Sequence, residues 1–165
     1  MLKRTHEVVG SYQKMEGRGG LYLIGDKVGN GGNLAEACAS EGYGYGYGFD
    51  KDCIPYDKGS DIEELKMSVK SSGASLACIY RNSNTAEDFK SIIAEYFANV
   101  HSVRWCYVVL IDNTANLYEM NAEEFKEFLM NWAGMSKESG KECYKIKFKK
   151  TSGIMVKWLE EKVEE

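Results

Sequence analysis

The sequence predicts one domain of 165 residues that combines helices and strands, an α/β fold of the α+β kind. Residues 103–111 (VRWCYVVLI) form an apolar run typical of a buried strand. Residues 86–100 carry apolar side chains at helical spacing, as do Phe125, Phe128, Leu129 and Trp132 further along the chain. Residues 144–149 alternate between apolar side chains and lysine, which predicts a half-buried strand with one lysine face.

Composition and charge narrow the class of protein. Hydrophobic residues at 44% and charged residues at 28% are ordinary for a globular protein, and no apolar run approaches the roughly 18 residues of a membrane span. No signal-peptide pattern opens the chain, so we expect a cytoplasmic protein without a membrane partner. The five cysteines are odd in number and lack CxxC spacing, which favours buried free thiols over a zinc site or a disulfide framework. A net charge of −4 argues against a general nucleic-acid coat protein, but not against a cleft that concentrates basic residues.

The first third of the chain holds two informative patterns, whereas residues 1–25 predict little. Asn33 followed by Glu36 is a capping-box pattern and predicts a helix that begins near residue 34. Glu36 could cap this helix, project into a functional site, or do both. Glycine and tyrosine alternate over residues 42–48, so Tyr45 and Tyr47 share one face of an extended segment. These rings either stack on nucleic-acid bases or cover part of the core.

The rest of the chain predicts an alternation of strands and helices. Residues 66–71 and 74–80 are strand-like, the helix over 86–100 and the strand over 103–111 follow, and a turn at 112–113 leads into a short strand. Asn121 caps the next helix, which ends near Gly134. Residues 136–142 are expected to be a polar loop, and the final helix begins at Thr151 or Ser152.

A group of charged residues stands before and within the strand over 66–71. Its alternation places Ser68 and Lys70 on one face, and directs Met67 and Val69 into a core. Asp61 lies just upstream, and an acid, a turn and a lysine on a strand are the parts from which several nucleases assemble a metal site. Glu64-Leu65-Lys66 fits an acid-x-lysine pattern but follows Asp61 too closely for a turn between two strands. Ser68-Val69-Lys70 leaves room for the turn but has serine where the acid belongs.

On these residues the chain resembles the PD-(D/E)xK nuclease superfamily, and type II restriction endonucleases most of all. The resemblance implies a mixed central β-sheet flanked by helices, with a restriction-endonuclease-like αβββαβ core over about residues 33–112. Residues 113–165 would then be an extension that supplies specificity or dimer contacts. Lys70 would be the family lysine, and Ser68 would stand in the place of the second acid, as in Ser-x-Lys members of the family.

The resemblance also implies a function, a Mg2+-dependent endonuclease that hydrolyses phosphodiester bonds in double-stranded DNA as a homodimer. The catalytic residues would be Asp61, Ser68, Lys70 and Glu36, and the metal, with Mn2+ as a substitute, would be held by Asp61, Glu36 and Glu64. The DNA contacts would come from Tyr45, Tyr47, Lys58, Lys147, Lys149 and Lys150. The alternatives are a DNA-binding module of nuclease fold without catalysis, a DNA repair or junction nuclease, and an adaptor that uses the tyrosine–glycine segment.

Overall fold

The computed structural model describes residues 1–7, 23–24, 27–28, 32–44, 62–72, 79–80, 89–112, 114–137 and 143–163. The strands in these ranges are β1 (Leu2–Glu7), β2 (Leu23–Ile24), β3 (Lys27–Val28), β4 (Met67–Ser71), β5 (Ile79–Tyr80), β6 (Arg104–Ile111), β7 (Thr114–Met120), β8 (Ala133–Lys137) and β9 (Cys143–Phe148). The helices are α1 (Gly32–Gly42), the short 3-10 helix η1 (Glu63–Leu65), α2 (Phe89–Asn99), α3 (Ala122–Trp132) and α4 (Gly153–Lys162).

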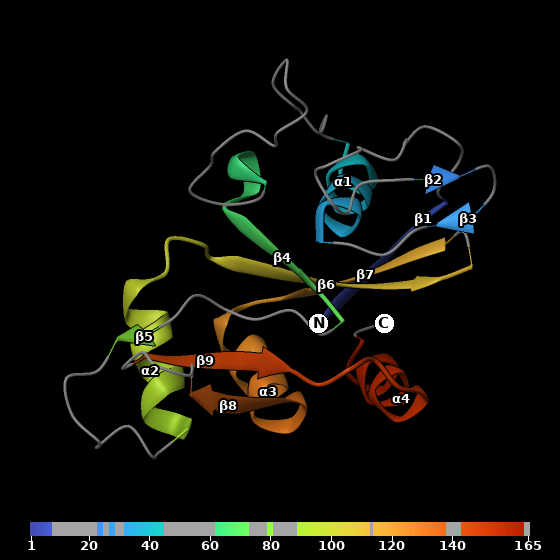
Figure 1. Cartoon of the computed structure of the whole chain (residues 1–165). Coiled ribbons are helices and arrows are strands. Elements are labelled where there is room, and N and C mark those ends of the chain that lie inside the picture. Colours follow the sequence, from blue (N-terminus) through green and yellow to red (C-terminus); the bar gives the residue numbers. More distant parts are fainter. Residues whose placement is uncertain are drawn as a thin grey trace.

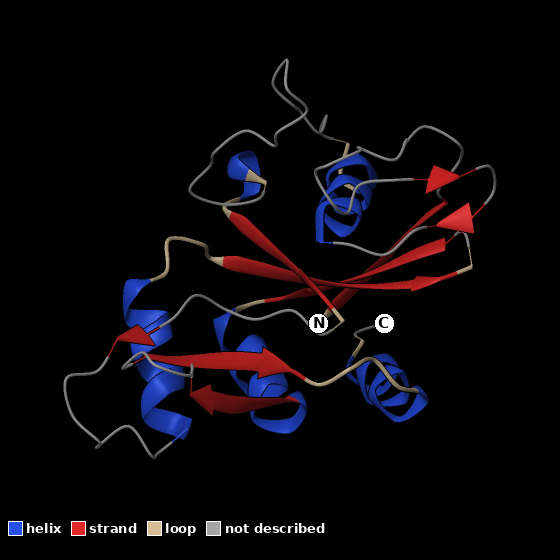
Figure 2. Ribbon diagram, in the orientation of Figure 1, coloured by secondary structure: helices blue, strands red, loops and turns tan. Residues whose placement is uncertain are grey.

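The largest sheet in the described residues has the strand order β1-β7-β6-β4. Strand β4 runs parallel to β6, whereas β6 and β7, and β7 and β1, are antiparallel. Parallel neighbours require a crossover connection, and α2 lies in the connection between β4 and β6. Figures 1 and 2 show α1 on one side of this sheet and α2, α3 and α4 on the other. The predicted mixed sheet flanked by helices is therefore confirmed.

Two smaller sheets accompany the central one. Strands β5, β9 and β8 form an antiparallel sheet in that order, and β2 pairs with β3. Strand β5 belongs to the strand-like run predicted at residues 74–80, and it pairs with β9. By residue 79 the chain has therefore left the neighbourhood of β4 and joined the second sheet.

Helix α1 covers one face of the central sheet. The buried apolar side chains on this face come from α1, the start of β4, β6 and β7, and they are Ala35, Cys38, Ala39, Ile62, Met67, Val69, Cys106, Val108, Ala115 and Leu117. At the end of α1 a Cβ on Gly42 would lie 2.6 Å from Leu117 Cδ1 and 3.3 Å from the Cβ of His6. Glycine therefore lets the end of this helix lie directly against β7 and β1.

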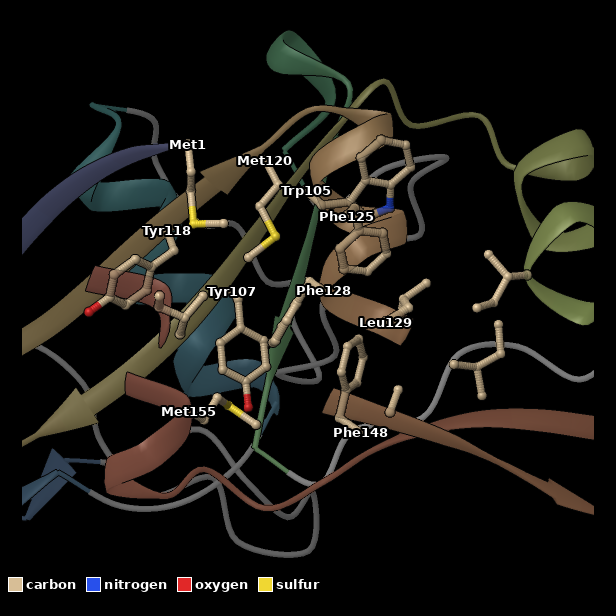
Figure 3. Packing of buried hydrophobic residues seen from close by; sticks show 14 of the residues in the cluster. Met1, Trp105, Tyr107, Tyr118, Met120, Phe125, Phe128, Leu129, Phe148 and Met155 are labelled. Carbon is tan, nitrogen blue, oxygen red and sulfur yellow. The ribbon is translucent and has the colours of Figure 1, made fainter. Parts of the chain in front are cut away.

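Aromatic rings fill the opposite face of the sheet, as Figure 3 shows. Trp105 of β6 stacks on Phe125 of α3, with ring centroids 5.1 Å apart and ring planes 9° apart. Tyr107 of β6 meets Phe128 edge to face at 4.8 Å. Edge-to-face and offset stacked geometries are favoured because they match the electrostatics of the rings. These contacts join α3 to β6 in one core that also includes residues of β9 and α4.

The ends of the last two described helices are set by their capping residues. Asn121 Oδ1 accepts a hydrogen bond from the backbone N–H of Glu124 at 2.9 Å, and Glu124 Oε1 accepts one from the N–H of Asn121 at 3.0 Å. This reciprocal capping box confirms the predicted start of α3. Ser152 caps α4 by accepting from Met155 N at 3.2 Å, which decides between the two residues proposed as its start.

Two strands differ from the sequence-based expectations. The prediction of a polar loop over residues 136–142 is wrong at its start, because β8 continues to Lys137 and Ser136 pairs with Lys145 of β9. Pairing with β9 supplies the backbone hydrogen bonds of this strand, although Gly134 and Ser136 have little strand propensity. Strand β1 has no clear sequence signal, because it is an edge strand whose side chains are mostly exposed.

The described helices are short. Helices α1, α2 and α3 have 11 residues each, and α4 has 10. A membrane-spanning helix needs about 20 apolar residues. Within the described ranges, no helix is long and apolar enough to cross a membrane.

The capping box at α3 yields a stability prediction. Replacing Asn121 with alanine removes the acceptor for Glu124 N–H, so we expect the free energy of unfolding to fall by about 1 kcal/mol in urea titrations. Asn131→Ala in the exposed part of the same helix is the control, and its effect should be within about 0.5 kcal/mol of zero. Equal effects of the two substitutions would contradict the assigned cap.

The contact between α4 and the central sheet yields a pH prediction. Glu160 is ion-paired with Lys3 and accepts a hydrogen bond from Tyr118 Oη at 2.7 Å. The hydrogen bonds from Lys3 and from Tyr118 hold the pKa of Glu160 below its usual range. A carboxyl group with a lowered pKa stabilises the fold above its ordinary pKa, and this contribution is lost as the pH falls through the lowered value.

We therefore expect Glu160→Gln to lower the free energy of unfolding at neutral pH, by less than about 1 kcal/mol because the ion pair is partly exposed. The difference from the wild type should shrink as the pH is lowered to about 3. Glu161→Gln, a neighbouring exposed carboxylate, is the control. A Glu160→Gln defect that stays constant with pH would rule out this charge contribution.

Candidate functional site

Strand β4 divides its side chains between the two faces of the central sheet. Met67 and Val69 are 0% and 4% exposed and pack in the core that α1 covers. Ser68 and Lys70 alternate with them and so lie on the aromatic face, where their register partners on β6 are Trp105 and Tyr107. Ser68 is 8% exposed, whereas Lys70 is half-buried at the margin of the core. The structure thus brings the predicted Ser-x-Lys pair to one face.

A polar cluster lies at the carboxyl end of β4. The hydroxyl oxygen of Ser72 accepts a hydrogen bond from the backbone N–H of Thr151 at 3.0 Å. The Thr151 hydroxyl is hydrogen-bonded to the phenol oxygen of Tyr107 at 2.8 Å. Burial raises the pKa of Tyr107 and outweighs the opposite effect of its bond to Thr151, so the phenol stays protonated at neutral pH. We call Lys70, Ser72, Tyr107 and Thr151 the β4-end cluster.

The β4-end cluster joins two groups of basic residues that are far apart in the sequence. Lys149 and Lys150 are exposed and directly precede Thr151, in the segment that leads from β9 to α4. Lys149 is also fixed through its backbone N–H, which donates to the carbonyl oxygen of Trp132 at 2.8 Å. Figure 1 shows this segment passing the end of β4. The segment that carries Lys149 and Lys150, two of the predicted DNA-contacting lysines, therefore approaches the strand that carries Lys70.

Lys147 precedes these two lysines and belongs to β9 itself. Its neighbours Ile146 and Phe148 are 0% and 2% exposed, whereas Lys147 is exposed. This confirms the predicted alternation of the strand. Lys147 faces solvent and pairs in register with Gly134 of β8.

Glu36 lies on the other side of the sheet from Lys70. It is a half-buried residue of α1, and α1 packs on the face that holds Met67 and Val69. Because Lys70 is on the aromatic face, the structure does not bring Glu36 to the same face as the Ser-x-Lys pair. Glu64 is an exposed residue of η1.

The remaining predicted site residues, Asp61, Tyr45, Tyr47 and Lys58, lie outside the described residues. The described chain resumes at Ile62, which is 1% exposed and exchanges backbone hydrogen bonds with Met67 at 3.0 and 3.1 Å. Lys66, at the turn between them, has φ of 49°, a left-handed conformation. The residue that follows Asp61 is thus held against the first residue of β4.

The described carboxylates do not form a metal site by themselves. In the part of the chain that the structure describes, no three His, Cys, Asp or Glu side chains are grouped closely enough to hold a metal ion. Glu36 does not share a face of the sheet with Lys70, and a site at β4 would need Asp61. Glu36 and Glu64 alone therefore give no metal site from which a chemical step could follow.

Sequence reasoning missed three members of the β4-end cluster. Tyr107 is part of the apolar run predicted as a buried strand, and Thr151 stands out in the sequence only as one of two starts for the final helix. Ser72 follows the predicted strand without any distinguishing pattern. Because Ser72 and Thr151 are 79 residues apart, their contact leaves no local signal in the sequence.

Two buried cysteines are unsuited to nucleophilic chemistry. Burial, together with the nearby Glu41, raises the pKa of the Cys38 thiol to about 12. Burial and the nearby Glu119 likewise raise the pKa of Cys106. A thiol in this state has almost no thiolate at neutral pH, so neither residue is suited to act as a nucleophile there.

We predict that iodoacetamide leaves Cys38 and Cys106 unmodified in the native protein at about pH 8, well below their raised pKa values. Peptide mass mapping should show modification of both residues once the chain is unfolded in denaturant. The denatured sample is the internal control, since there both thiols return to an ordinary cysteine pKa. Rapid native modification of Cys38 would show that this side chain is not buried between α1 and the sheet as described.

Comparisons of the chain with protein-family models, with curated proteins and with solved structures each found no match. The resemblance to the PD-(D/E)xK nucleases therefore depends on the residues of β4 and on the order of the elements around them.

Proposed function

We propose that the protein is a Mg2+-dependent endodeoxyribonuclease, similar to type II restriction endonucleases, that acts on double-stranded DNA as a homodimer. The observation that carries this proposal is the position of Lys70. It lies on the same strand face as Ser68, beside Tyr107, at the end of β4 where the segment with Lys149 and Lys150 arrives. A lysine on a strand next to further basic residues is suited to a reaction at a phosphate group.

The order of the described elements agrees with part of the αβββαβ core that the resemblance implies. Between residues 32 and 111 the described elements are α1, η1, β4, β5, α2 and β6, in that order. Strand β4 is followed through α2 by its parallel neighbour β6. An αβββαβ core has three strands between its two helices; the described residues supply β4 and β5 there, and β5 pairs with β9 of the second sheet and not with β4.

In the proposed reaction Lys70 is the group closest to the chemistry. Its ammonium group would stabilise the negative charge that develops on the phosphate, and would orient the attacking water. Lys149 and Lys150 would contact backbone phosphates and so hold the DNA in register. Asp61 is the proposed metal ligand, and Mg2+, when bound, would supply a water of lowered pKa and polarise the phosphate.

Burial gives a physical reason for serine at position 68. The side chain is 8% exposed and lies beside Trp105, so an aspartate or glutamate there would lose its hydration. The same observation favours a second candidate function, a nuclease-like DNA-binding module without catalysis. In that case Lys70 would be a phosphate contact, and Asp61 would have no metal to bind.

Substitution of Lys70 separates the two functions. We expect Lys70→Ala to reduce Mg2+-dependent nicking of supercoiled DNA by roughly 100-fold or more, as when one charge-stabilising donor is removed. DNA affinity, measured by fluorescence anisotropy in EDTA, should fall by less than about tenfold, since the variant gives up a single phosphate contact. Asp61→Ala should abolish nicking and retain binding.

Lys126→Ala provides the matched control, because Lys126 lies on α3 and pairs with Glu123 at 3.3 Å, away from β4. It should nick DNA at the wild-type rate. A wild-type protein that binds duplex DNA and nicks neither duplex nor branched substrates with Mg2+ or Mn2+ would establish the binding module and reject the nuclease. Cutting confined to branched substrates would indicate a junction nuclease.

A further inference from the structure

Thr151 holds together three parts of the chain that meet at the end of β4. Its backbone N–H donates to Ser72 Oγ at 3.0 Å, and its hydroxyl is hydrogen-bonded to Tyr107 Oη at 2.8 Å. It also directly precedes Ser152, the N-cap of α4. The chain from β9 to α4 is thus attached to both β4 and β6 at this one residue.

Tyr107 gives this attachment a rigid base. Its side chain is 1% exposed, and its ring lies 4.8 Å from Phe128 and 5.7 Å from Phe148. Figure 3 shows the ring extending from β6 with Phe128 and Phe148 on one side of it and Met155 of α4 on the other. Packing on several sides restricts the ring, so its hydroxyl is a fixed point for the Thr151 side chain.

Both lysine groups are placed with respect to this fixed point. Lys70 is the register partner of Tyr107 on the neighbouring strand, and Lys150 is bonded directly to Thr151. Lys149, which precedes Lys150, is held at its backbone, because its N–H donates a hydrogen bond to the carbonyl oxygen of Trp132 at 2.8 Å. A segment that is already fixed loses less conformational freedom on binding a ligand than a free loop does.

We propose that Thr151 is a positioning residue, which holds Lys149 and Lys150 so that they and Lys70 contact phosphates of the same DNA strand. This inference rests on the part of the proposed function in which the protein binds DNA, and it does not require that the protein cleaves DNA. The Tyr107–Thr151 hydrogen bond is the element that couples the segment to the sheet. Without it, the lysines keep their charge but lose their fixed relation to Lys70.

The test removes this one hydrogen bond from either end. Thr151→Val keeps the shape of the side chain and the N–H that bonds to Ser72, and Tyr107→Phe keeps the packed ring. Affinity for a labelled duplex is measured by anisotropy in EDTA, over a series of salt concentrations. Each variant should bind about threefold to tenfold more weakly, as expected for the loss of one partly buried hydrogen bond.

Two further variants examine the mechanism. The double variant Thr151→Val/Tyr107→Phe should bind no more weakly than either single variant, because both substitutions remove the same bond. Thr151→Ser retains the hydroxyl and should restore wild-type affinity. The slope of log affinity against log salt should become shallower in Thr151→Val by about 0.9 for each phosphate that is no longer neutralised, and the same change should appear in Lys150→Ala.

Tyr118→Phe is the matched control for general loosening of the core. It removes the hydroxyl of another tyrosine that is 1% exposed, one that bonds to Glu160 of α4 at 2.7 Å, on a different strand. It should reduce the thermal midpoint to an extent similar to Tyr107→Phe and leave DNA affinity unchanged. Weaker DNA binding by Tyr118→Phe would overturn the positioning role, since it would show that any loss of stability has this effect.

The inference and the proposed nuclease can fail separately. A wild type that cuts DNA, together with Thr151→Val and Tyr107→Phe variants that bind within twofold of it at an unchanged salt slope, would overturn the role of Thr151 alone. A wild type that binds DNA without cutting, and whose binding is weakened by Thr151→Val, would reject the nuclease and retain the positioning role. A wild type that does not bind duplex DNA at low salt would reject both.

Discussion

The structure depends on the burial of β6 on both of its faces. Cys106 and Val108 point into the core under α1, whereas Trp105 and Tyr107 point into the aromatic core of α3, β9 and α4, and all four are at most 2% exposed. When the side chains of a strand are buried on both faces of its sheet, other elements must pack against each of the two faces. Helix α1 therefore covers one side of the sheet, and α2, α3 and α4 cover the other (Figure 2).

The same constraint decides which residues of β4 can act together. As the parallel neighbour of β6, β4 must send Met67 and Val69 toward α1, so Ser68 and Lys70 emerge beside the aromatic core. Ser68 is covered there and Lys70 only partly. A lysine at the boundary between core and solvent keeps its charge hydrated while its position is fixed, as required of a group that contacts a phosphate.

The alternation of β4 also bears on where a metal could bind. Glu36 belongs to the helix on the opposite face, so it would have to reach the Lys70 face around the edge of the sheet. Asp61 is adjacent to Ile62, which is hydrogen-bonded to the first residue of β4 and so anchors the chain there. Basic residues, by contrast, converge on the end of β4 from two parts of the sequence. The proposed DNA contact and the proposed catalysis therefore place different demands on the fold.

The sequence by itself determined the local elements. The Asn121 cap of α3, the buried run at β6 and the alternation of β4 and β9 follow from interactions within a few residues, and the structure has each of them. Only the tertiary structure decided which strands pair with one another and which distant side chains come into contact. The pairing of β5 and β8 with β9, and the edge strand β1, depend on backbone hydrogen bonds that any sequence can make. The contact of Thr151 with Ser72 joins residues 79 apart, and it exists because β6 and β4 are held in place by their packing. The pattern of its strand therefore singled out Lys70 as a candidate, whereas no local pattern singled out Ser72, Tyr107 and Thr151, which lie near it in the structure.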